Sequence, residues 1–120
     1  MNTSITPIIS VNELLPLQND ANLVLIDASN AKNALERYQE KHLHKAIFFF
    51  FYTQLATINE DVSIGGRHPL PNVEDFIKTL ENIGISTESH VVIDDFDNGA
   101  NAAARLWWML KAIGHKKVQV

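Results

Sequence analysis

Val91-Val92-Ile93-Asp94-Asp95-Phe96-Asp97-Asn98-Gly99-Ala100 is the stretch that decides the fold of this chain. A short apolar run leads into an acidic turn, and an apolar segment with helical periodicity follows at residues 100–113. Such a run predicts a strand that is buried on both faces, and the turn predicts a helix whose amino end faces it. Because helix amino ends attract anions, the stretch indicates an anion site or a nucleophile cradle that here holds carboxylates.

Strands and helices alternate along the rest of the chain. Apolar runs predict strands at 23–28, 46–49, 90–94 and 118–120. Helical periodicity predicts helices at 31–41, 73–83 and 100–113, and a capping box at Ser10–Glu13 opens a shorter one. This alternation of apolar strands and helices is typical of an α/β domain with a mostly parallel sheet and helices on both faces.

The composition limits the classes of function. The chain has 120 residues, which fits one domain, and a formal net charge of -4 with scattered basic residues, so we expect no nucleic-acid partner. No apolar stretch is long enough to span a membrane, and residues 1–10 do not resemble a signal peptide. The chain contains no cysteine, which excludes disulfides and thiolate chemistry within it. We therefore expect a cytoplasmic protein without a membrane association.

The carboxyl ends of the predicted strands carry the polar candidates. Ligands of parallel sheets bind at that edge, so we expect residues 27–30, 50–52 and 94–99 to lie near one another. Asp94, Asp95 and Asp97 could bind a divalent cation or act as an acid and base, but the EF-hand pattern fails because Leu106 stands at its twelfth position. The interpretation we favour is that these carboxylates cap the following helix.

Other candidates have ordinary structural explanations. His42 and His44, beside two lysines, fit a solvated turn better than a metal site, and His68 fits a surface loop. Trp107 and Trp108 are adjacent, so they point to different sides of their helix and fit core packing better than a stacking platform. Arg105, in the same helix, is expected to pair with a carboxylate. We expect no metal and no cofactor.

Several segments, in order along the chain, together form a recognisable pattern. They are Leu25-Ile26-Asp27-Ala28-Ser29, Tyr38 through Ala46-Ile47-Phe48-Phe49, His68-Pro69-Leu70-Pro71, Val91-Val92-Ile93, Ala103-Ala104-Arg105-Leu106-Trp107-Trp108-Met109-Leu110 and Gly114-His115. These segments resemble the N-terminal domain of tandem rhodanese-type sulfurtransferases, the thiosulfate and 3-mercaptopyruvate sulfurtransferases. The most specific similarity is the helix segment of alanine, arginine and paired tryptophans that precedes the Gly-His pair.

The resemblance implies a rhodanese-like three-layer α/β/α fold with about five strands, formed by residues 1–120 as a single domain. In that family a cysteine of the second domain takes up a sulfane sulfur as a persulfide and passes it to a thiophilic acceptor. The first domain is a degenerate copy with a carboxylate at the matching loop position, where Asp95 stands here. The resemblance thus implies no catalytic residue in this chain and a C-terminal rhodanese domain as its partner.

The chain departs from the family pattern at two places. Lys41, His44 and Lys45 replace the Gly, Pro and Gly of the turn that contains His42. Phe50 and Tyr52 stand where mercaptopyruvate-type members have an aspartate, although His68 matches their loop histidine and is a candidate for reaching a shared active site.

Three hypotheses for the function follow. Because the chain ends in its last predicted strand, we expect it to be a fragment of a two-domain sulfurtransferase and to be inactive alone. The alternative is a stand-alone degenerate rhodanese module that binds another protein or associates with itself. A carboxylate enzyme that depends on a metal is the third.

Overall fold

The structure is a computed structural model that describes residues 5–29, 33–43, 45–49, 71–95 and 102–120. Its centre is a four-stranded sheet in the order β2-β1-β3-β4, and all three strand pairs are parallel. The strands are β1 (Leu23–Asp27), β2 (Ile47–Phe48), β3 (His90–Asp94) and β4 (Val118–Gln119). The predicted α/β class and parallel sheet are confirmed, and the described residues form four strands where about five were expected.

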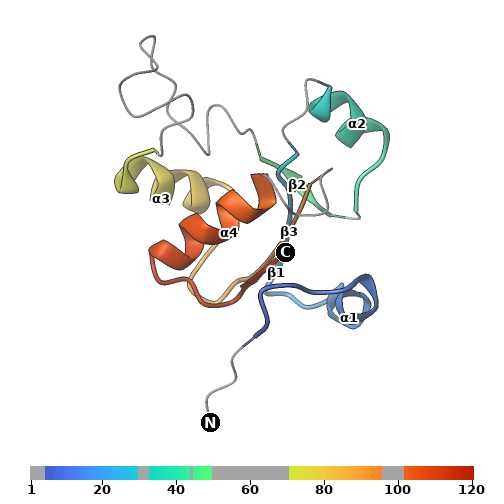
Figure 1. Cartoon of the computed structure of the whole chain (residues 1–120), viewed down its shortest axis with the longest axis horizontal. Helices are drawn as coiled ribbons and strands as arrows, with labels where there is room; N and C mark the ends of the chain where they lie inside the picture. The colour runs from blue at the N-terminus through green and yellow to red at the C-terminus, as the bar shows by residue number, and fades with distance from the viewer. Residues whose placement is uncertain (1–4, 30–32, 44, 50–70, 96–101) are drawn as a thin grey trace.

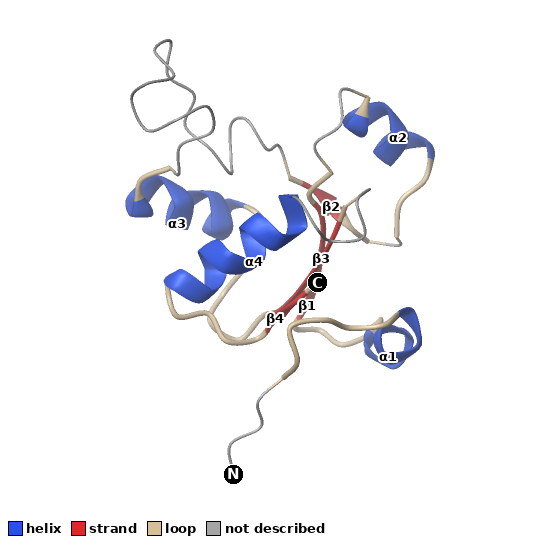
Figure 2. Ribbon diagram, in the orientation of Figure 1, coloured by secondary structure: helices blue, strands red, loops and turns tan. Residues whose placement is uncertain are grey.

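Helices cover both faces of this sheet, which gives the predicted three layers (Figure 1). On one face lie α3 (Val73–Asn82) and α4 (Ala102–Ala112). On the other lie α1 (Val11–Leu14), the 3-10 helix η1 (Leu15–Leu17) and α2 (Ala34–Glu40), as Figure 2 shows. No helix in the described ranges is long and apolar enough to cross a membrane.

The alternation of side chains along β1 and β3 divides the core into two layers, because successive residues of a strand point to opposite faces. Ile26 and Ile93, each 1% exposed, pack on the side of α3 and α4. Leu25 and Val92 pack on the side of α1 and α2. The larger layer, under α3 and α4, contains the aromatic and aliphatic side chains Phe49, Phe76, Leu80, Leu106, Met109 and Leu110.

The ends of the helices follow the sequence signals. Ser10 and Glu13 form the predicted capping box at α1. Asn72 caps α3, because its side-chain oxygen accepts a hydrogen bond from the backbone N–H of Asp75 at 2.8 Å. Gly84 and Gly114 follow α3 and α4 with φ angles of 88° and 92°, in the left-handed region that glycine tolerates best. Helix α2 begins at Ala34, later than the predicted residue 31, although residues 30–32 lie outside the description.

The amino-terminal segment borders the sheet beyond β4. The backbone N–H of Ile9 donates to the carbonyl of Val120 at 3.0 Å, and the N–H of Val120 donates to the carbonyl of Pro7 at 2.8 Å. This is the bonding pattern of a parallel pair. The four-stranded sheet thus has one more backbone segment at its edge, although this segment is not itself a strand.

Candidate functional site

The candidate site lies at the carboxyl ends of β1, β2 and β3, where the strands finish side by side. Asp27, the last residue of β1, is paired with Asp94, the last residue of β3, and with Phe48 at the end of β2. This juxtaposition of Asp27 with Asp94 confirms the expectation that the strand ends bring these carboxylates together. The other residues expected here, Asp97 and residues 50–52, lie outside the described part of the chain, as do His44 and His68.

Asp27 has a structural task at this edge. It is 4% exposed, and its Oδ1 accepts a hydrogen bond from the backbone N–H of Ser29 at 2.9 Å. The N–H of Ala28 donates to the carbonyl of Asp94 at 2.9 Å, so the ladder between β1 and β3 continues into the turn. The Asp27 carboxylate therefore replaces a backbone acceptor where the strand ends.

Asp94 is the most perturbed carboxyl group among the described residues. Burial, first of all, and the negative charges of Asp27 and Asp95 together raise its pKa to about 6, while nearby His42 opposes the shift. Its Oδ1 is buried and forms no hydrogen bond. A buried, unpaired carboxylate oxygen beside other carboxylates disfavours the charged form, so Asp94 takes up a proton in mildly acidic solution.

Asp95 faces the opposite side of the sheet and stabilises α4. Its Oδ2 accepts a hydrogen bond from the backbone N–H of Ala103, in the first turn of α4, at 2.8 Å. The first N–H groups of a helix lack partners within the helix and carry a partial positive charge. The interpretation that a carboxylate of this loop caps the following helix is confirmed for Asp95. An anion site at the helix amino end is thus filled by the protein itself.

The separation of Asp94 from Asp95 bears on metal binding. Asp94 lies two residues after Val92 in β3 and therefore on the same face, the one that packs toward α2, whereas Asp95 bonds to α4. Within the ranges that the structure describes, no three His, Cys, Asp or Glu side chains gather as a metal-binding group.

The turn that leads into β2 is held by an aromatic cluster. Tyr38 donates a hydrogen bond from its hydroxyl to the carbonyl of Ala46, and its ring stacks on that of His42 at 4.0 Å. His42 donates from Nδ1 to the carbonyl of Tyr38 at 2.6 Å. Lys45 has a φ of 66°, a left-handed conformation that glycine adopts without strain. The turn therefore has the left-handed backbone conformation that suits the glycine of the family, although Lys45 stands at this position.

The two tryptophans point to different sides of α4, as predicted. Trp107 is half-buried and donates from Nε1 to the carbonyl of Val118 at 3.2 Å, whereas Trp108 is 53% exposed. The ammonium group of Lys111 lies 5.6 Å from the centre of the Trp107 ring. They do not form a common stacking surface. Arg105 is half-buried, and this burial lowers the pKa of its guanidinium group.

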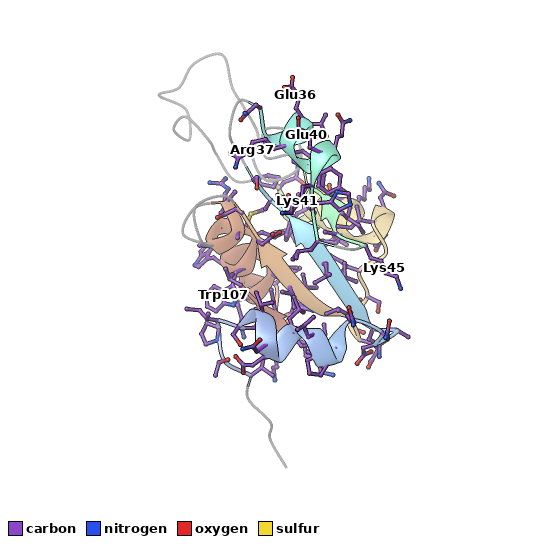
Figure 3. The ribbon with its side chains drawn as sticks, turned by 90° about the vertical axis from the view of Figure 1, so that its right-hand side faces the viewer. Glu36, Arg37, Glu40, Lys41, Lys45 and Trp107 are labelled. Carbon is purple, nitrogen blue, oxygen red and sulfur yellow. The ribbon has the colours of Figure 1, made fainter. Side chains whose placement is uncertain are left out.

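Charged side chains gather on α2, beside the candidate site. Figure 3 shows Glu36, Arg37, Glu40 and Lys41 together on this helix, and all four are exposed. Helix α2 follows β1, so these charges lie toward the edge where Asp27 and Asp94 end their strands. They give that edge a polar border on the side of α2.

One polar group was missed by the sequence reasoning. Gln119 is 6% exposed, and its side chain donates from Nε2 to the carbonyl of Thr6 at 2.9 Å. Its Oε1 accepts a hydrogen bond from Nε2 of His90 at 2.8 Å. Gln119 is flanked by valines in a short apolar run, and no motif marks it, so only the arrangement of the strands reveals its role.

Comparisons with known proteins agree with this architecture. No family model matches the chain. In an alignment of 119 residues that covers 95% of the chain, it is 35% identical to thiosulfate/3-mercaptopyruvate sulfurtransferase 2 of Arabidopsis thaliana. In an alignment of 104 residues that covers 82% of the chain, it is 35% identical to 3-mercaptopyruvate sulfurtransferase of Mus musculus. The chain spans about a third of the length of these relatives, 33% in each case.

A solved structure has the same fold. The 3-mercaptopyruvate sulfurtransferase from Leishmania major superposes with a TM-score of 0.76 at 27% identity, covering 88% of this chain and 30% of that one. Similarity in sequence and structure over nearly the whole chain identifies the family: the chain is a rhodanese-type domain related to the thiosulfate and 3-mercaptopyruvate sulfurtransferases.

Proposed function

We propose that this chain is the non-catalytic, N-terminal rhodanese domain of a two-domain sulfurtransferase, and that it packs against a second domain that carries the reactive cysteine. The observation that carries the proposal is the hydrogen bond from the N–H of Ala103 to the Asp95 carboxylate. A sulfur-carrying thiolate would need such a donor at a helix amino end. In this chain the donor already serves a fixed carboxylate.

The absence of cysteine supports the same role. The 120 residues contain no thiol that could accept a sulfane sulfur, and a carboxylate oxygen cannot carry one as a persulfide. The relatives are about three times as long as the aligned region, which leaves room in those proteins for another domain. Transfer from thiosulfate or 3-mercaptopyruvate would then depend on the partner domain, while this domain supplies shape and charge to the cleft.

Activity measurements test this proposal. The 120-residue chain should produce no thiocyanate from thiosulfate and cyanide, whereas the whole gene product that contains it should be active. In that gene product, replacing the partner domain's reactive cysteine with serine should abolish transfer, and D95N should keep activity within about twofold because it preserves a capping oxygen. Turnover by the 120-residue chain alone would contradict the non-catalytic assignment.

A second candidate function is protein binding without catalysis, as a stand-alone degenerate module. It is favoured by large apolar side chains left exposed on the helices, among them Val73 at 59% and Trp108 at 53%. A gene that encodes no further domain, together with a stable complex in size-exclusion chromatography, would favour this function over the first.

We propose the cytoplasm as the location, since a chain without cysteine has no need of an oxidising compartment. Imaging of a fluorescent fusion tests it, and a signal confined to an organelle would contradict it.

A further inference from the structure

A groove lies at the amino ends of β3 and β4, opposite the edge that carries Asp95. Its volume is about 720 Å³, and it runs between the carboxyl ends of α3 and α4. The loop before β3 and the loop before β4 close it, and they are joined by a hydrogen bond of 2.9 Å from Nε2 of His115 to the carbonyl of Ser89. The groove is thus framed by the same two helices and strands that form the larger core layer.

The centre of the groove is apolar. Leu80 and Ile85 are buried at 5% and 8% exposure, while Ile77 and Ile113 stand at its sides with 39% of their surface exposed each. Ile77 belongs to α3 and Ile113 follows the end of α4, so both segments present apolar surface that water contacts in the single chain. Covering such a surface is favourable because it removes apolar area from water.

The two walls of the groove carry opposite charges. Glu81 at the end of α3 and Glu88 in the loop before β3 make the acidic wall. Lys116 and Lys117, in the loop before β4, make the basic wall. None of these four side chains forms an ion pair with a residue in the described part of the chain. Their charges are therefore available to a partner.

We propose that this groove is the interface of a homodimer with twofold symmetry. In such an interface each copy uses the same patch, so a residue on one side of the axis meets a residue from the other side of the partner's patch. A twofold axis through the groove places the acidic wall of one copy against the basic wall of the other and joins the two apolar centres. A second copy of this chain is thus complementary to the groove in both charge and polarity.

The proposal does not rest on the sulfurtransferase role. The groove lies at the amino ends of the strands and the Asp95 loop at their carboxyl ends, so association would leave the Asp95 edge free. We expect the dimer to form in a concentration-dependent manner.

Sedimentation equilibrium of the 120-residue chain over a range of concentrations tests the association. The chain should pass from monomer to dimer as the concentration rises, and I77K or I113K should weaken the dimer about tenfold or more. L35K is the matched control, because Leu35 is also 39% exposed but belongs to α2. A chain that stays monomeric at the highest attainable concentration, or an L35K effect equal to that of I113K, would overturn the proposal.

Charge reversal tests the twofold geometry. E81K/E88K makes both walls basic and K116E/K117E makes both acidic, so each variant alone should be monomeric through repulsion. An equal mixture of the two should form a heterodimer, because each all-basic groove then meets an all-acidic one. E36K/E40K changes two exposed residues of α2 by the same charge and should leave the wild-type dimer intact. A mixture that remains monomeric would refute the twofold arrangement.

Discussion

The Asp95 carboxylate lies 2.8 Å from the backbone nitrogen of Ala103 and accepts its hydrogen bond. This contact joins the residue after β3 to the first turn of α4. It places a carboxylate at a helix amino end, where negative charge is most stabilising. The same contact occupies the N–H donor that a reactive thiolate would need, and it therefore supports the proposed lack of catalysis.

Removing this cap should destabilise the domain. We expect D95A to lower the free energy of unfolding by about 1 kcal/mol, the usual cost of losing a helix cap, because the N–H of Ala103 loses its acceptor. D95N retains an oxygen at the same place and should lose less. Urea denaturation followed by circular dichroism measures both. Equal stability of D95A and the wild type would show that the contact has no capping value.

The raised pKa of Asp94 predicts a dependence of stability on pH. The folded-state pKa of about 6 lies above the ordinary aspartate pKa of 3.8, so the folded protein binds the proton more tightly than the unfolded chain. The stability that Asp94 contributes is complete below pH 3.8 and is lost as pH rises through 6. D94N should therefore be more stable than the wild type at pH 7, by about 1 to 2 kcal/mol after allowance for solvent screening.

This advantage of D94N should shrink as the pH falls from 7 to 4. Thermal unfolding of both proteins at a series of pH values gives the comparison, and E74Q, at an exposed position of α3, serves as the control. A D94N advantage that stays constant across this pH range would show that protonation of Asp94 is not its source.

Lys45 offers a test of backbone strain. With a φ of 66° it occupies the left-handed region, which costs a residue with a Cβ atom about 1 kcal/mol relative to glycine. K45G should raise the stability by up to about 1 kcal/mol, reduced by the greater freedom of glycine in the unfolded chain. K45A removes the same charge but keeps the Cβ atom and should give no gain. A K45A variant as stable as K45G would contradict the strain explanation.

Gln119 should hold the amino-terminal segment against β4. Q119L removes the acceptor of His90 and the donor to Thr6 while keeping a side chain of similar size. His90 is half-buried and Thr6 is exposed, so water can partly replace the lost hydrogen bonds. The loss should cost about 1 kcal/mol, and unfolding should occur at a moderately lower urea concentration. Hydrogen exchange would also accelerate at the amide of Ile9, which bonds to Val120. Unchanged exchange there would mean that Gln119 does not secure the segment.

Much of the fold could be predicted from local patterns. The apolar run at His90–Asp94 forms a strand with the predicted bounds, and the caps at Ser10 and Asn72 begin the expected helices. These features depend on residues within a few positions of one another. Helix and strand periodicity and helix capping can therefore be inferred without knowledge of distant contacts.

The sequence by itself determined the class of the fold, the absence of a thiol and the presence of acidic residues after β3. Only the tertiary structure decided what each acidic residue does. It set Asp94 beside Asp27, where burial and like charge favour protonation, and it directed Asp95 to the N–H of Ala103. The hydrogen bond from Gln119 to Thr6, which are 113 residues apart in the sequence, also depends on the tertiary structure. The physical reason is that burial and hydrogen-bond partners are set by residues distant in the chain, which local patterns cannot specify.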